Sequence, residues 1–239
     1  MIRRYIPDAI TSMNLVCGVI GVVFAFSGRC DIAFVLMLAA AVFDFCDGLA
    51  ARLLGAYSDF GKELDSLCDA VSFGVLPSVM LFSEARSFAF GAHAWVPWTA
   101  LAIAVFSALR LAKFNVDTRQ TSSFLGLPTP ACSMLVGALC CYVAHDPGCF
   151  LGIWMSGPVF VPVLTVCLCA LLVCEIPMFS LKMHKDDPSP LKAKRIALAA
   201  IVVAAILVCA ICRLHYSLAV LLVLVCYILK NLVYAVTRI

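Results

Sequence analysis

The sequence predicts an all-α protein that spans a membrane as a bundle of helices, and three observations lead to that fold class. First, 64% of the 239 residues are hydrophobic and the mean hydropathy is +1.07, whereas a soluble domain is about 45–50% apolar. Second, charged residues make up only 13% of the chain, about half the usual share. Third, the apolar residues gather in stretches of about 20, the length that crosses a bilayer as a helix.

We expect eight of these stretches to be transmembrane helices. They cover approximately residues 11–28, 31–54, 60–82, 95–113, 128–145, 157–181, 194–213 and 217–236. The short segment IRRYIPDAI before the first of them is interpreted as an interfacial helix, and polar connections occupy 114–127 and 182–193. Because the connections are short, we expect one integral membrane domain over 1–239, which we divide into a six-span core over 1–181 and two additional spans over 182–239.

The 14 cysteines do not point to a disulfide framework, because most of them lie inside apolar stretches. We interpret them as small apolar side chains at helix contacts. Cys209 and Cys212 have the spacing of a redox motif but lack its usual sequence surroundings.

The distribution of basic residues predicts the orientation, since loops rich in Lys and Arg stay in the cytoplasm. If the N-terminus is cytoplasmic, all but Arg29, Arg86 and Arg213 of the 17 Lys and Arg residues fall on the cytoplasmic side. We therefore expect a multi-pass protein of the cell membrane with both termini in the cytoplasm.

One stretch contrasts with the apolar remainder. The segment VFDFCDGLAARLLGAYSDFGKELDSLCDAVSFG, over Val42–Gly74, carries five aspartates, a glutamate, an arginine and a lysine. In the predicted orientation it forms a helical hairpin at the cytoplasmic side that turns at GAYS. Asp59 and Glu63 lie near this turn and are expected to be solvated.

Helical periodicity places the remaining carboxylates on two faces of this hairpin. At 100° per residue, Asp44, Asp47, Gly48, Ala51 and Arg52 fall within an arc of about 140°, and Gly61, Asp65, Asp69 and Ser72 fall within about 80°. The two acidic faces can therefore oppose each other across the hairpin.

Such a grouping needs compensating charge. Each carboxylate at membrane depth costs roughly 2.5–3.5 kcal/mol, and four cost on the order of 10 kcal/mol before their mutual repulsion. Two divalent cations supply that charge, and ligands that are all oxygen suit Mg²⁺ or Mn²⁺. The residues alone leave two alternatives open, which are a proton or cation pathway and pairing of the carboxylates with Arg52, Arg110 and Lys113.

The small residues Gly48 and Ala51 are also open to two interpretations, since they leave room for a ligand but serve equally well in close helix packing. A cation transporter would carry ionisable residues at mid-depth on several spans. The later spans here are nearly bare of them, with Glu175 as the main exception. This pattern favours a site confined to the hairpin.

The acidic hairpin resembles the signature of the CDP-alcohol phosphatidyltransferases. The match is the pattern Asp44-x2-Asp47-Gly48-x2-Ala51-Arg52-x8-Gly61-x3-Asp65-x3-Asp69. The stretches GKELDSLCDAVSFGVLPS, ALRLAKFNV and GLPTPA are similar to the branch of this family that uses serine, and together they cover the first six spans. A basic residue directly after Asp69 would instead indicate the glycerophosphate branch.

The resemblance implies transfer of the phosphatidyl group of CDP-diacylglycerol to the hydroxyl of L-serine, with release of CMP. It implies that Asp44, Asp47 and Asp65 coordinate two divalent cations, Mn²⁺ or Mg²⁺, and that Asp69 is shared between coordination and general base. It places Gly48, Ala51, Arg52 and Gly61 against the CDP moiety. The partners that it implies are these two substrates and membrane lipids, with no nucleic acid, and a homodimer is compatible with it.

The acceptor's carboxylate needs cationic partners near the metals, and Arg110 is the best candidate because it ends the fourth span at the depth of Asp69. Lys113 and Ser72 are expected to assist, although Lys113 stands where the serine branch usually has a second arginine and a lysine lacks the bidentate fork. Basic residues at this depth also face lipid phosphates in many proteins. The alternative is a sister enzyme with glycerol 3-phosphate, inositol phosphate or choline as acceptor, or with an archaeal ether lipid as donor.

Overall fold

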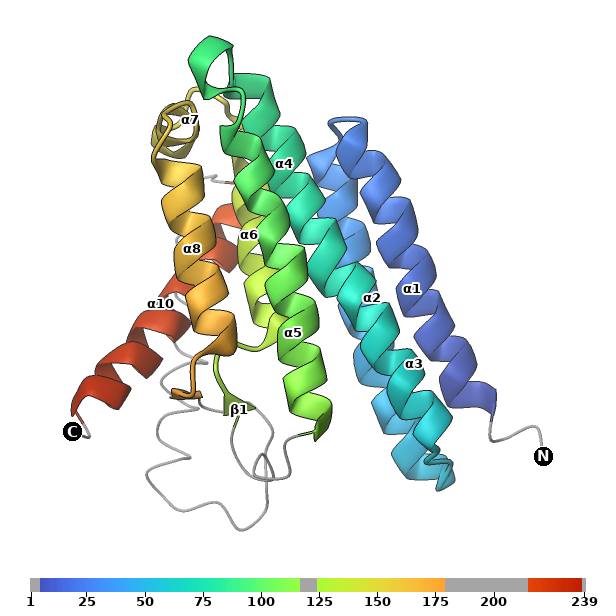
Figure 1. The fold of residues 1–239 in the computed structure, drawn as a ribbon. Coiled ribbons are helices and arrows are strands. Elements are labelled where there is room, and N and C mark those ends of the chain that lie inside the picture. The colour runs from blue at the N-terminus through green and yellow to red at the C-terminus, as the bar shows by residue number, and fades with distance from the viewer. Residues whose placement is uncertain (1–4, 117–123, 179–214, 238–239) are drawn as a thin grey trace.

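The computed structural model describes residues 5–116, 124–178 and 215–237. These residues form a bundle of helices that run up and down along a common direction, with one short two-stranded ribbon (Figure 1). The predicted fold class is therefore confirmed. The predicted span 194–213, the polar connection 182–193 and the pair Cys209 and Cys212 lie outside the described residues.

The first two helices form an antiparallel pair. Helix α1 covers Tyr5–Phe26 and α2 covers Cys30–Leu54. From Tyr5 onward the chain is one continuous helix, so residues 5–10 belong to α1, which begins before the predicted start of the first span at residue 11. Pro7 does not interrupt it, because a backbone N–H in the first helical turn has no partner within the helix and its loss costs nothing.

The third span is one long helical rod with a change of winding in its middle. Its parts are α3 (Asp59–Asp69), the π-helical turn η2 (Ala70–Val75) and α4 (Leu76–Phe88). The turn between α2 and α3 occupies residues 55–58, as predicted. Ser58 caps α3 by accepting a hydrogen bond from the backbone N–H of Gly61 over 2.9 Å.

The next spans complete the bundle around α6, whose bounds are Thr129–His145. The fourth span begins with the 3₁₀ segments η3 (Gly91–His93) and η4 (Val96–Leu101) and continues as α5 (Ala102–Val116). The short helix α7 (Phe150–Met155) was not predicted and leads into α8 (Phe160–Val173). The last described helix is α10, which covers Tyr216–Thr237 and crosses the bundle obliquely beside α6 (Figure 1).

Helix α8 is shorter than predicted, and the expected continuation to residue 181 is wrong. The backbone is extended at Cys174, and Pro177–Met178 forms β2, which pairs antiparallel with β1 (Phe124–Leu125). Gly126 makes this contact possible. Its φ is +76°, and a Cβ there would lie 2.7 Å from the carbonyl oxygen of Cys174.

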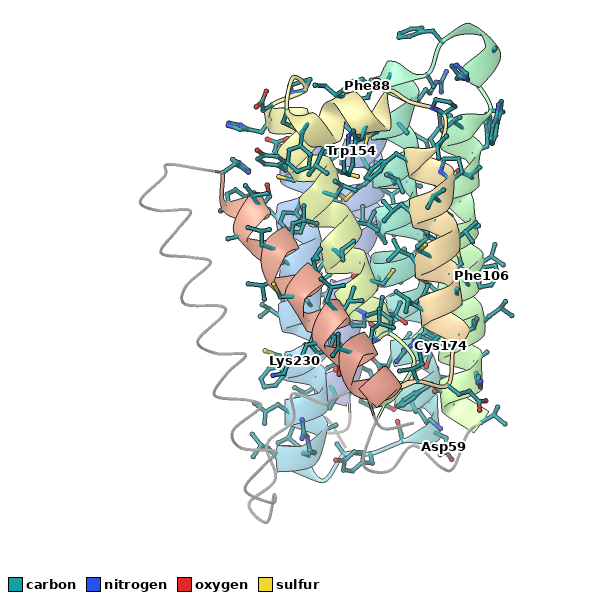
Figure 2. All side chains as sticks on the ribbon, turned by 90° about the vertical axis from the view of Figure 1, so that its left-hand side faces the viewer. Asp59, Phe88, Phe106, Trp154, Cys174 and Lys230 are labelled. Carbon is teal, nitrogen blue, oxygen red and sulfur yellow. The ribbon has the colours of Figure 1, made fainter. Side chains whose placement is uncertain are left out.

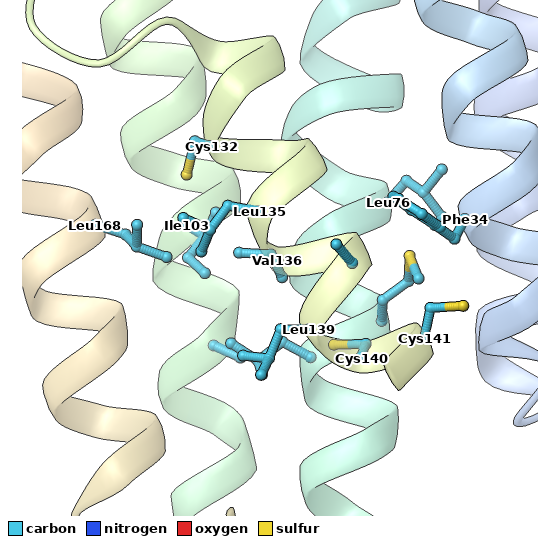
Figure 3. Close-up of a cluster of buried hydrophobic side chains, with 14 of the residues drawn as sticks. Phe34, Leu76, Ile103, Cys132, Leu135, Val136, Leu139, Cys140, Cys141 and Leu168 are labelled. Carbon is cyan, nitrogen blue, oxygen red and sulfur yellow. The ribbon is translucent and has the colours of Figure 1, made fainter. Parts of the chain in front are cut away.

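The apolar core lies between the helices, with α6 near its centre. Phe34 of α2, Leu76 of α4, Ile103 of α5 and Val136 of α6 are fully buried (Figure 3). The cysteines of the described residues are free thiols, and those on α6 pack in this core. This agrees with the interpretation of the cysteines as small apolar side chains.

The two ends of the bundle differ in chemistry. Within the described ranges, five helical segments are long and apolar enough to cross a membrane, whereas α6 and α8 are shorter apolar helices. We call the end that contains the α2–α3 turn the turn end; α1 begins there and α10 ends there (Figure 1). At the opposite end Trp95, Trp98 and Trp154 are exposed, which is typical of an aromatic belt at a membrane surface (Figure 2 labels Trp154).

Candidate active site

Three of the predicted metal-binding carboxylates meet near the turn end of the bundle. Asp44 and Asp47 come from α2 and Asp65 comes from α3, and each contributes a carboxylate oxygen that lies within 4.8 Å of the other two. The two acidic faces of the hairpin do oppose each other, as helical periodicity predicts. We call these three residues the aspartate triad.

The triad is suited to a hard divalent cation. Its ligand atoms are all carboxylate oxygens, which Mg²⁺ and Mn²⁺ prefer. Asp47 is buried, and Oδ1 of Asp65 is buried without a hydrogen-bond partner in the part of the chain that the structure describes. An unsatisfied carboxylate oxygen at this depth is costly, and a bound cation would satisfy it.

Asp69 stands apart from the triad but close to it. Its side chain is buried, and it interacts electrostatically with Asp44, Asp65 and Asp47. Asn14 on α1 donates a hydrogen bond from Nδ2 to Oδ1 of Asp69 over 3.1 Å. Asp69 is therefore a carboxylate that a protein donor holds beside the oxygens of the aspartate triad.

Helix α1 contributes two polar residues that our sequence reasoning missed. The hydroxyl of Thr11 donates to Oδ2 of Asp47 over 2.6 Å, and Asn14, one turn further along, holds Asp69. Both side chains are buried. The signal was present in the sequence, because an amide and a hydroxyl three residues apart within an apolar span need partners inside the bundle.

The π-helical turn η2 directly follows Asp69 and directs Ser72 toward α1. The Ser72 hydroxyl donates to the backbone carbonyl of Asn14 over 3.1 Å. A Cβ on Gly18 would lie 3.0 Å from Cα of Ser72, so only glycine lets α1 approach this closely. Local π-helical winding is often found at functional sites, and here it positions the segment that carries Asp69.

Arg110 reaches the site from α5. Its side chain is buried, Nη1 donates to Oγ1 of Thr129 over 3.0 Å, and its guanidinium interacts electrostatically with Asp69. Gly74 allows the close packing of η2 against α5, because a Cβ there would lie 3.1 Å from Cβ of Ser107. The expectation that Arg110 lies at the depth of Asp69 agrees with this arrangement.

Lys113 is placed differently from Arg110. Its Nζ lies 2.9 Å from Oε1 of Glu175, and both side chains are largely exposed, at 41% and 60%. This ion pair joins the end of α5 to the segment after α8. A second link at this end joins α5 to α3, since Nδ2 of Asn115 donates to Oγ of Ser66 over 2.8 Å.

The residues expected to contact CDP lie on α2 and α3, the two helices that carry the triad. Nε of Arg52 donates to the carbonyl oxygen of Gly48 over 2.9 Å. This bond holds the exposed guanidinium against its own helix, α2, which also carries Asp44 and Asp47. A Cβ on Gly48 would meet only Nη2 of Arg52, at 4.0 Å, so the space beside Gly48 is open. Ala51 is half-buried on the same helix, and Gly61 approaches Asp8 of α1.

The two remaining acidic residues of the stretch do not join the site. Asp59 and Glu63 are exposed near the α2–α3 turn, as predicted (Figure 2 labels Asp59). They add no ligand to the triad.

Fold and site together define a class of protein, namely a polytopic helical membrane protein with a cluster of carboxylates near one end that could hold a metal ion. Comparison with protein-family models identifies the family within this class. The model described as CDP-alcohol phosphatidyltransferase matches residues 4–173, which is more than half of the chain. The chain therefore belongs to the CDP-alcohol phosphatidyltransferase family, as the sequence motifs indicate.

Three relatives illustrate the similarity. The CDP-diacylglycerol–serine O-phosphatidyltransferase of Mycobacterium leprae is 34% identical over 201 residues, which cover 78% of this chain and 61% of that protein. The protein of the same name from Bacillus subtilis is 36% identical over 135 residues, 55% of this chain and 72% of that protein. The archaetidylserine synthase of Methanothermobacter thermautotrophicus is 34% identical over 135 residues, 56% of each chain.

Proposed function

We propose that the protein transfers the phosphatidyl group of CDP-diacylglycerol to the hydroxyl of L-serine and releases CMP. The observation that carries this proposal is the grouping of the aspartate triad, Asp69 and Arg110 in one part of the bundle. The triad supplies ligands for cations that bind a diphosphate, Asp69 supplies a base, and Arg110 supplies a cation for an anionic acceptor.

The relatives' names favour serine over other acceptors. The bacterial relatives are named for CDP-diacylglycerol and serine, and the archaeal relative is named for archaetidylserine. These names differ in the lipid and agree in serine. The chain spans only 61% of the M. leprae protein. We therefore assign the activity in that relative's name to this chain as a proposal. A sister enzyme with glycerol 3-phosphate, inositol phosphate or choline as acceptor remains the alternative.

The triad and Asp69 would hold two divalent cations, Mg²⁺ or Mn²⁺, which would neutralise the diphosphate and stabilise the departing CMP. Asp69 accepts the proton of the serine hydroxyl as its oxygen attacks the phosphorus that bears the diacylglycerol. The new bond joins the serine oxygen to that phosphorus, and the bond from phosphorus to the CMP oxygen breaks. CMP leaves with that electron pair.

Other residues of the chain bind and orient the two substrates. Gly48 and Ala51 leave room for the CDP moiety, and Arg52 lies where its guanidinium can meet phosphate oxygens. Gly61 lies across the hairpin from them. Arg110 is proposed to bind the serine carboxylate. Lys113 and Ser72 are weaker candidates for that role, because Glu175 and the Asn14 carbonyl already engage them.

The turn end is proposed to face the cytoplasm, with both termini on that side. The support is the predicted excess of Lys and Arg there, and the exposed tryptophans at the opposite end mark the other membrane surface. A soluble acceptor and the headgroup of a lipid donor can then meet at the interface. A homodimer remains an expectation.

The test is incorporation of labelled serine into lipid by the purified protein, with CDP-diacylglycerol and Mn²⁺ or Mg²⁺. We expect phosphatidylserine and CMP in equal amounts. EDTA should abolish both products, and added Mn²⁺ or Mg²⁺ should restore them. Full activity in the chelator would refute the metal site, and absence of labelled lipid with an active metal-loaded enzyme would refute serine as the acceptor.

A further inference from the structure

Asn14 has a buried polar atom for which the bundle provides no partner. The side chain is fully buried, and its Nδ2 donates to Asp69, yet its Oδ1 has no hydrogen-bond partner among the described residues. A buried amide oxygen without a partner is destabilising, because it has lost its hydrogen bonds to water and gained none in return. Native structures seldom leave such an atom unpaired without a functional or solvent partner.

The orientation of this amide follows from chemistry. Asp69 must be a carboxylate to act as a base, and a carboxylate only accepts hydrogen bonds. The nitrogen of the Asn14 amide must therefore face Asp69, and the oxygen must be the free atom. Because both amide atoms are bonded to one carbon, Oδ1 lies beside the Asp69 carboxylate.

The position of Asn14 is fixed independently of the ligand. Its backbone carbonyl accepts a hydrogen bond from Ser72 in η2, the turn that follows Asp69. Gly18, one turn further along α1, lets the two helices approach closely. Asn14 and Asp69 are thus held together by main-chain packing as well as by their side-chain bond.

We infer that Asn14 recognises the ammonium group of the acceptor through Oδ1 while its Nδ2 orients Asp69. The inference rests on the proposed function and deepens it. In L-serine the hydroxyl and the ammonium are on adjacent carbons, so a hydroxyl at Asp69 brings the ammonium within reach of Asn14. The ammonium is the donor that satisfies Oδ1.

Arg110 completes this arrangement from the other side. It comes from α5 and interacts electrostatically with Asp69, whereas Asn14 comes from α1. The acceptor's hydroxyl then lies at Asp69, its carboxylate faces α5, and its ammonium faces α1. Three helices therefore each bind a different group of the acceptor. This arrangement accounts for selection of an amino acid over a simple alcohol as the acceptor.

The experiment compares serine with 3-hydroxypropanoate, which keeps the hydroxyl and the carboxylate but lacks the amine. The variants are Asn14→Ala and Asn14→Leu. We expect the preference for serine, as the ratio of the two kcat/KM values, to fall about tenfold or more, the scale of a hydrogen bond to a charged group. Where turnover of the analogue is below detection, the preference is measured instead as the ratio of the inhibition constant of 3-hydroxypropanoate, in competition with serine, to the KM for serine.

Three further readouts separate recognition of the ammonium from a general structural role. The KM for CDP-diacylglycerol should change less than twofold in both variants, and kcat with serine should fall because Asp69 loses its orienting donor. The preference for serine over ethanolamine, which lacks the carboxylate, should not change. Ser12→Ala is the matched control, because its exposed hydroxyl bonds to the carbonyl of Asp8 on the same helix, and all constants should stay at wild-type values.

The outcomes are distinguishable. If the wild type uses serine and both variants lower the rates with serine and 3-hydroxypropanoate equally, the preference is unchanged and the inference is wrong while the proposed function stands. If the wild type releases CMP with glycerol 3-phosphate and not with serine, the proposed function fails and the inference fails with it. Asn14→Ser, whose hydroxyl is too short to reach both partners, should show the same loss of preference if the apolar variants do not accumulate.

Discussion

The hydroxyl of Thr11 on α1 lies 2.6 Å from Oδ2 of Asp47 on α2 and donates a hydrogen bond to it. A helix outside the acidic hairpin therefore orients one carboxylate of the aspartate triad. Hydrogen bonds of this kind tune metal sites, and removing such a supporting partner typically lowers metal affinity or activity about 10–100-fold.

Thr11→Val removes this bond while it keeps the shape of the side chain. We expect the Mn²⁺ or Mg²⁺ concentration for half-maximal activity to rise about tenfold, with near-normal kcat at saturating metal. Metal titration of activity provides the measurement. An unchanged metal requirement would mean that Thr11 only completes the packing of α1 against α2.

Excess metal should restore activity to variants of the aspartate triad but not to a variant of Asp69. Asp47→Asn and Asp65→Asn keep an oxygen but lose the charge, so metal affinity should fall and excess metal should restore part of the activity. Asp69→Asn removes the proposed base, so kcat should fall about 10²–10⁴-fold and excess metal should not restore it. Near wild-type kcat in Asp69→Asn would show that another group accepts the proton.

Arg110→Ala should impair binding of the acceptor more than binding of the donor. We expect the KM for serine to rise because serine loses about 2–3 kcal/mol of binding free energy, the scale of a charge-assisted hydrogen bond. The KM for CDP-diacylglycerol should change little. With ethanolamine as the acceptor, which has no carboxylate, the same variant should raise the acceptor KM much less. Equal increases in both substrate KM values would indicate that Arg110 supports the bundle through Thr129 instead.

Cysteine labelling tests the orientation of the protein. In a variant without other cysteines, a cysteine at Tyr57 in the α2–α3 turn should react only from the cytoplasm. A cysteine at Ser27, in the exposed turn between α1 and α2, should react only from outside; Cys30 itself is buried and is a poor probe. The reverse pattern would place the site on the wrong side for a cytosolic acceptor.

The triad was predictable because it depends on α-helical geometry alone. Asp44 and Asp47 share a face of α2, and Asp65 lies on the opposing face of α3, so the regular spacing within each helix and the turn at residues 55–58 were enough to bring them together. The same reasoning placed Asp59 and Glu63 outside the site. Burial and charge then made divalent cations the natural ligand.

What could not be predicted depends on contacts between distant segments. Helical spacing puts Ser72 on the Asp69 face, and both side chains bond to Asn14, but the particular partner of the Ser72 hydroxyl, a backbone carbonyl of α1, depends on how α1 packs against η2. Lys113 pairs with Glu175, 62 residues away. Neither the spacing nor the composition of either segment specifies these pairings.

CMP release with different acceptors tests the central claim most directly. Purified protein with CDP-diacylglycerol and Mn²⁺ should be offered serine, glycerol 3-phosphate, inositol phosphate or choline in separate reactions, each repeated with EDTA. The account predicts metal-dependent CMP release with serine and little above background with the others. Release with one of the others and none with serine would contradict it and would assign the protein to a sister branch of the family.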